Sequence, residues 1–171
     1  MKLKIWMLAA SLAVLASCGP SYRATDQYGV VIPVRTQTAF TTQYPNATVV
    51  TWSQYDAATL LIDWDLAGWP EMDQNDYVVR FRMDNEPYYA WYDSDGNWIG
   101  TAYVINDYKT LPSAVSNTIN SQFSGYTITS VNKEFQKDRM VYEVQLRNGE
   151  SKAKLLIDGN GNIIRQKTVM K

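Results

Sequence analysis

The sequence DSDGNWI at residues 93–99 recurs as DGNGNII at residues 158–164, 65 positions further along the chain. Each copy contains a Gly-Asn pair followed by two apolar residues, and both glycine and asparagine tolerate the positive φ of a tight turn. The stretch therefore predicts two β-hairpin turns at equivalent places in an internally repeated chain.

The repeat extends toward the N-terminus of each turn, at an offset of 79. In both copies a proline is followed by apolar residues spaced four apart, which predicts a short amphipathic helix. The matching residues are Val31-Ile32-Pro33 with Phe40 and Tyr44 in the first copy, and Thr110-Leu111-Pro112 with Ile119 and Phe123 in the second.

Alternating apolar and polar residues predict four strands in each copy. They cover residues 48–52, 77–83, 87–92 and 98–104 in the first copy, and 127–131, 142–147, 152–157 and 163–169 in the second. We therefore expect an α+β fold, a tandem repeat of a helix packed on a four-stranded antiparallel sheet, with repeats at 31–106 and 107–171. Phe40, Tyr44, Trp52 and Tyr77 are expected in the core.

The change of offset from 79 to 65 gives the first copy 79 − 65 = 14 extra residues. They fall between Trp52 and Tyr77, and the segment near 63–76 has no counterpart in the second copy. Its acidic residues are Asp63, Asp65, Glu71, Asp73 and Asp76. Two of them could form a glycosidase pair, but an acidic surface loop is the simpler interpretation.

Residues 1–17 place two lysines before a short apolar run, which predicts a secretory signal peptide. The run ends in Leu-Ala-Ser-Cys and resembles a bacterial lipobox, so Cys18 is the expected lipid attachment site. The alternative is an ordinary secretory cleavage site followed by a free cysteine. Residues 18–30 are polar and predict a lipidated tether.

The formal charge is 16 − 17 = −1 for the chain, and 14 − 17 = −3 without residues 1–17. A weakly acidic body is not expected to bind nucleic acid. Because Gly19 follows the cysteine where aspartate would favour inner-membrane retention, we expect a lipid anchor in the bacterial envelope, in the outer membrane facing the periplasm.

The sequence contains no histidine and one cysteine. No zinc site, internal disulfide or histidine-dependent catalysis is therefore expected. The alternating oxygens of Asp93, Asp95 and Asn97 could suit calcium, but the glycine is at the wrong position for an EF-hand and the turn is favoured. We expect neither an enzyme nor a cofactor or metal.

Aromatic and arginine side chains point to a binding surface. Lys152 and Lys154 align with Pro87 and Tyr89 and should mark the solvent-facing side of the sheet. Exposed tyrosine, tryptophan and arginine are enriched in binding hot spots. The predicted partner-binding residues are Tyr89, Trp91, Arg80, Arg82, Trp64 and Trp69. Alternatively, the insert folds back and its tryptophans cover this face as additional core.

The two helices, the Trp-bearing strand and the repeated turn resemble the PepSY-like family of bacterial exported proteins, described as similar to beta-lactamase inhibitory protein. The resemblance covers about residues 31–169 and rests on Ile32-Pro33, Trp52, Asp95-Gly96-Asn97-Trp98, Leu111-Pro112 and Asn160-Gly161-Asn162. It implies tandem helix-and-sheet modules whose sheet faces hold another protein, with an envelope peptidase as one such partner.

The sequence thus predicts a membrane-anchored, non-catalytic lipoprotein that binds a protein partner. A carbohydrate-binding lipoprotein would use the same tryptophans and tyrosines as stacking platforms. A structural envelope protein without a ligand would instead bury them against one another.

Overall fold

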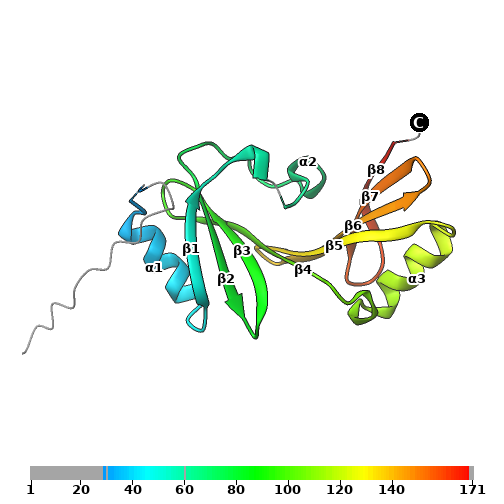
Figure 1. Ribbon diagram of the computed structural model, residues 1–171, viewed down its shortest axis with the longest axis horizontal. Helices are drawn as coiled ribbons and strands as arrows, with labels where there is room; N and C mark the ends of the chain where they lie inside the picture. The colour runs from blue at the N-terminus through cyan, green and yellow to red at the C-terminus, as the bar shows by residue number, and fades with distance from the viewer. Residues whose placement is uncertain (1–28, 30, 60, 170–171) are drawn as a thin grey trace, which may run out of the picture.

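The computed structural model describes residues 29, 31–59 and 61–169 and contains eight strands (Figure 1). The strands are β1 Thr48–Gln54, β2 Tyr77–Met83, β3 Glu86–Tyr92, β4 Trp98–Val104, β5 Thr127–Gln136, β6 Arg139–Asn148, β7 Ser151–Asp158 and β8 Ile163–Val169. The α-helices are α1 Val34–Gln43, α2 Trp64–Ala67 and α3 Ser113–Gln122, and short 3-10 helices lie at Ala57–Thr59 and Tyr108–Thr110.

All eight strands form one antiparallel sheet in the order β1 to β8. The predicted fold class, a tandem repeat with a separate four-stranded sheet in each copy, is therefore wrong. β4 pairs with β5, with Thr101 opposite Phe135 and Val104 opposite Asn132. The prediction ended the fifth strand at residue 131, but β5 continues to Gln136 and supplies the partner for β4. This pairing joins two edges whose backbone groups would otherwise be unpaired.

One face of the sheet carries α1 at one end and α3 at the other (Figure 1). Phe40 of α1 packs against Trp52 of β1 and Phe81 of β2, with ring centroids 5.4 and 5.0 Å apart. The second core contains Val115 and Ile119 of α3. The expected core residues Phe40, Trp52 and Tyr77 are buried, and Tyr44 packs against them half-buried.

Both repeated stretches form the hairpin turn that the sequence favoured. Asp93 Oδ1 accepts hydrogen bonds from the N–H groups of Asp95 and Asn97, at 2.9 and 2.8 Å. The carboxylate is thus used within the turn. Gly161 has φ +86°, and a Cβ on it would lie 2.6 Å from the Ala114 carbonyl oxygen of α3. Glycine is therefore needed both for the turn and for the close approach of the helix.

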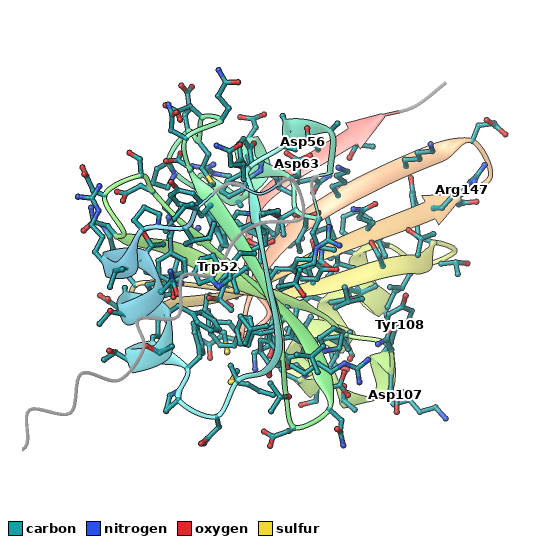
Figure 2. The ribbon with its side chains drawn as sticks, turned by 60° about the vertical axis from the view of Figure 1, so that its left-hand side comes forward. Trp52, Asp56, Asp63, Asp107, Tyr108 and Arg147 are labelled. Carbon is teal, nitrogen blue, oxygen red and sulfur yellow. The ribbon has the colours of Figure 1, made fainter. Side chains whose placement is uncertain are left out.

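The other face carries the segment between β1 and β2, described at residues 55–59 and 61–76, which runs from the β2–β4 end of the sheet to the β6–β8 end (Figure 1). It contains the 14 extra residues, and we call the whole segment the insert. Ile62 belongs to a core cluster that includes Val78 of β2. Leu66 of α2 forms a second cluster with Val141 and Leu156, of β6 and β7. In Figure 2, Asp56 and Asp63 of the insert lie on the side of the sheet away from Asp107 and Tyr108, which precede α3. The sheet is therefore a middle layer between two helices and the insert.

Candidate partner-binding site

The predicted aromatic face is brought together but is filled by the insert. Trp91 of β3 is 3% exposed and Trp69 of the insert is 6% exposed. Trp69 contacts the rings of Trp64 and Trp91 edge-on, with centroids 5.0 and 5.3 Å apart. Gly100 makes room for it, because a Cβ there would lie 2.4 Å from the Trp69 ring. Of the two arrangements left open by the sequence, the structure has the covered one.

Four of the six predicted partner-binding residues retain exposed surface. Arg80 and Arg82 of β2 are exposed, whereas Tyr89 and Trp64 are half-buried. The Arg80 guanidinium lies 5.4 Å from the centroid of the Tyr89 ring, a cation-π contact. These four residues form the exposed edge of a packed core. Their role in partner binding stays a prediction.

Asp63 holds the insert to the second half of the sheet. It caps α2 by accepting the Leu66 N–H at 3.0 Å, and it forms ion pairs with Lys154 and Lys167 at 3.0 and 2.7 Å. Partial burial acts to raise the pKa of Asp63, but hydrogen bonds from Lys167, the Leu66 N–H and Lys154 outweigh it and lower the pKa to about 2. Asp63 is thus a structural anion and not a free acid.

Two carboxyl groups are enclosed beneath the insert. Glu134 of β5 and Glu143 of β6 are both 0% exposed. Glu143 accepts the Asp63 N–H at 2.7 Å. Burial and then the charge of Glu143 raise the pKa of Glu134 to about 9, which favours the protonated form of Glu134 at neutral pH. Neither carboxyl oxygen of Glu134 has a hydrogen-bond partner among the described residues. The pair resembles an acid and base couple, but it lacks the access that a substrate would need.

An open aromatic surface lies on the opposite, helix-bearing face, in the strip between α1 and α3. Tyr88, Tyr103 and Phe135 are cross-strand neighbours on β3, β4 and β5, and we call them the aromatic strip. Their ring centroids are 4.7 Å apart for Tyr88 and Tyr103 and 6.3 Å apart for Tyr103 and Phe135. All three are half-buried. The strip therefore presents ring surface that neither helix covers.

A cavity of about 350 Å³ opens beside the aromatic strip. It is lined by Gln43, Tyr44, Met83, Tyr88, Trp98, Thr101, Phe135 and Lys137. The ammonium of Lys133 lies 5.3 Å from the centroid of the Phe135 ring and 5.9 Å from that of Tyr103. Its position among the rings fixes a positive charge next to apolar surface.

The sequence did not identify the aromatic strip as a site. The alternation of residues in its strand places Tyr88 on the core-facing side of the sheet, and the structure has it on that side. Alternation does not predict how much of that side a helix covers. Phe135 lay outside the predicted strands. A useful signal would have been the length of the helices, since ten residues extend only about 15 Å and leave part of a wide sheet uncovered.

Some predicted features lie outside the described residues. The signal peptide at 1–17, the lipid site Cys18 and most of the tether at 18–30 are among them. Within the described part of the chain, none of the helices has the length and apolar character needed to span a membrane. In that same part, no three His, Cys, Asp or Glu residues are grouped as they would be to bind a metal ion.

The architecture is an antiparallel sheet with two helices on one face and the insert on the other. The family model described as "Putative beta-lactamase-inhibitor-like, PepSY-like" matches residues 75–165, more than half of the chain, so this protein belongs to the PepSY-like family. The match begins at β2 and includes the join between β4 and β5.

Solved structures share the fold. A BLIP-like protein from Bacteroides fragilis is 22% identical with a TM-score of 0.64, covering 81% of this chain and 87% of its own. A DUF2874 family protein from Bacteroides uniformis is 23% identical with a TM-score of 0.63, covering 80% and 89%. A structure from Bacteroides eggerthii, described as one of "putative periplasmic proteins", is 22% identical with a TM-score of 0.61, covering 80% and 88%. No curated protein sequence matches this chain.

Proposed function

We propose that this protein is an exported, lipid-anchored and non-catalytic binding protein that holds a segment of a partner protein on the aromatic strip. The observation that carries this proposal is the row of half-buried rings on β3, β4 and β5. Tyrosine and phenylalanine bury large areas with little loss of rotamer freedom, as is typical of hot spots at interfaces.

The occupant that fits best is a short segment with an apolar side chain next to an acidic one. The apolar group would enter the cavity of about 350 Å³, which accommodates one or two side chains. The carboxylate would meet the ammonium of Lys133 or Lys137, which flank the rings on β5 and at its end. An envelope peptidase is one candidate partner of this kind.

Export and anchoring rest on the first eighteen residues. The predicted signal peptide ends at the cysteine that a lipobox requires, and acylated anchors bind membranes stably when two or more chains are attached. The similarity to the Bacteroides eggerthii structure, with its periplasmic description, supports a periplasmic location for this chain too. Incorporation of labelled palmitate into the wild-type chain and its loss in Cys18→Ala would test the anchor.

Site-specific photo-crosslinking would test the partner site. A photoreactive amino acid at Tyr88 should yield a discrete crosslinked partner in envelope extracts, whereas the same group at Ser121, on the exposed side of α3, should not. The partner should bind Tyr88→Ala/Phe135→Ala about 30-fold more weakly, as expected for the loss of a hot spot.

Arg80→Gln/Arg82→Gln is the matched control on the opposite face. It should retain the partner with unchanged affinity. Loss of the partner in this control, with retention in Tyr88→Ala/Phe135→Ala, would return the site to the face predicted from the sequence. Far-UV circular dichroism and thermal unfolding of each variant would show that the fold is intact.

Carbohydrate binding is the second candidate, because the rings of Tyr103 and Phe135 are within 20° of parallel. Parallel rings open to solvent suit stacking against a sugar. An oligosaccharide that binds the wild-type chain in a glycan array and is lost in Phe135→Ala would favour this function over protein capture.

A further inference from the structure

A row of cations crosses the insert-side face at the second half of the sheet. Lys152 and Lys154 alternate on β7 with the buried residues Ala153 and Leu155, so their side chains leave the face opposite α3. Arg147 lies directly opposite Lys152 across β6 and β7, and Lys167 lies directly opposite Lys154 across β7 and β8. Like charges in directly opposed positions of a sheet repel one another.

The insert neutralises one of these two pairs. Asp63 bridges Lys154 and Lys167, and the Asp65 carboxylate adds a second contact to Lys167 at 2.8 Å. Arg165 also donates to the Asp65 carbonyl oxygen at 2.9 Å. The face therefore already binds one acidic segment, Asp63-Trp64-Asp65. Its two carboxylates pair with cations of the sheet, and the Trp64 ring packs against Trp69 and Trp91.

The other pair has no such anionic partner. Within residues 29, 31–59 and 61–169, no carboxylate lies within ion-pair distance of Arg147 or Lys152. Both side chains are exposed, and Arg147 donates to the neutral Gly149 carbonyl oxygen at 2.8 Å. Figure 2 shows Arg147 at the outer end of β6, apart from Asp63 of the insert. The repulsion of this pair is relieved only by solvent and salt.

Two neighbouring cavities, which together we call the depression, lie beside the neutralised pair and the open one. A cavity of about 410 Å³ lies beside Asp63 and Asp65, and a second of about 230 Å³ lies beside Arg147 and Lys152. Gln145 and Lys154 line both cavities. The depression is thus bordered by the insert at one end and by two cations without a carboxylate at the other.

We propose that this depression is a second docking surface, which binds an acidic segment of a partner protein beside the insert. A carboxylate of the partner bridges Arg147 and Lys152 as Asp63 bridges Lys154 and Lys167, while Gln145 supplies hydrogen bonds between the two positions. The chain as a whole is acidic, so an extended polyanion would meet repulsion elsewhere, whereas a short segment would meet only the cation row.

Fluorescence anisotropy with the full-length chain in detergent would test this surface. The probe is a labelled peptide with the sequence of residues 62–69, and the comparison peptide has asparagine in place of both aspartates. We expect the first peptide to bind, the second to bind at least tenfold more weakly, and the affinity of the first to fall as salt is raised from 50 to 500 mM.

Arg147→Gln/Lys152→Gln should weaken binding of the acidic peptide about tenfold, whereas Arg35→Gln/Lys109→Gln removes the same charge at exposed positions outside both proposed sites and should not. Equal binding to all three proteins, or no binding to the wild type, would overturn the proposal. Binding of phosphatidylglycerol vesicles should not depend on these two residues. If Arg147→Gln/Lys152→Gln weakens binding to such vesicles but not to the acidic peptide, the cations bind a membrane and the proposal is overturned. Because the aromatic strip lies on the opposite face, Tyr88→Ala/Phe135→Ala should leave this binding intact, which separates the two proposals.

Discussion

The two ends of the insert-side face differ although their strands follow the same repeat. At one end Tyr89 and Trp91 lie on β3, and the insert covers them with two further tryptophans. At the other end the aligned strand β7 has Lys154 and Leu156 in these positions, where Asp63 pairs with Lys154 and Leu66 packs against Leu156. The two strands have equivalent places in the repeat. Their side chains therefore decide which part of the sheet becomes core and which part stays exposed.

The largest expected effect is the loss of stability when Trp69, the central ring of the covered end, is removed. Trp69→Ala deletes a side chain that is 6% exposed and contacts two other tryptophans, and it should lower the free energy of unfolding by about 3–5 kcal/mol. Urea unfolding followed by circular dichroism would measure this. A loss below about 1 kcal/mol would mean that the insert is not packed on the sheet in solution.

Overfilling the same contact should have the next largest effect. Gly100→Ala places a methyl group 2.4 Å from the Trp69 ring and should cost about 3 kcal/mol, because either the ring or β4 must move. Gly159→Ala is the matched control, since its methyl group would lie at an ordinary contact distance of 3.5 Å from Met140. Equal thermal stability of the two variants would contradict the packing described above.

The buried carboxyl pair should give the protein an unusual pH dependence. Glu134 keeps its proton in the native state up to a pKa of about 9, whereas in the unfolded chain it loses the proton near 4.5. Between these values unfolding releases a proton, so stability falls as pH rises, by at most about 1.4 kcal/mol per pH unit. Glu134→Gln should flatten this dependence and be more stable than the wild type at pH 8.

The comparison with the wild type should include the acid range. Asp63 contributes stability above its ordinary pKa of 3.8 that is lost as pH falls toward 2, and Glu134→Gln should leave this acid loss unchanged. Denaturant midpoints measured from pH 2 to pH 9 would separate the two carboxyl groups. Parallel profiles for the variant and the wild type would show that Glu134 is not held as a neutral acid.

The smallest effect concerns the ion pairs at the open end. Asp63→Asn keeps a capping side chain for α2 but leaves Lys154 opposite Lys167, and it should cost about 1 kcal/mol. Asp95→Asn breaks the exposed ion pair with Arg35 and should change stability by less than about 0.5 kcal/mol. Asp95→Asn serves as the control. If it lowers the free energy of unfolding as much as Asp63→Asn does, the ion pairs of Asp63 do not hold the insert to the sheet. Chemical denaturation at low and high salt would compare them.

Local features of the fold could be predicted from the sequence, whereas its long-range joins could not. The strand Tyr77–Met83 and the turns at Gly96 and Gly161 follow from alternation and from the need for positive φ, which are properties of neighbouring residues. The pairing of β4 with β5 depends on residues 132–136, where Asn132 and Glu134 are polar yet buried. From the sequence, these two polar residues would be expected to face solvent. They are buried because the insert covers them.

The candidate sites show the same division. The sequence grouped Tyr89, Trp91, Trp64 and Trp69 correctly, since strand alignment and composition identify residues that belong together. Whether they face solvent depended on the path of 14 extra residues, which has no counterpart in the repeat. The aromatic strip was missed because it is defined by the space that α1 and α3 leave free.

The anchoring of the insert also sets an order of folding. Lys167 and Arg165 bind Asp63 and Asp65 across about 100 intervening residues. During synthesis, therefore, α2 has no ionic partner on β8 until about 100 further residues have been made. The tryptophans of the insert pack against β2, β3 and β4, so their core can form before the ionic contacts of α2 with β8.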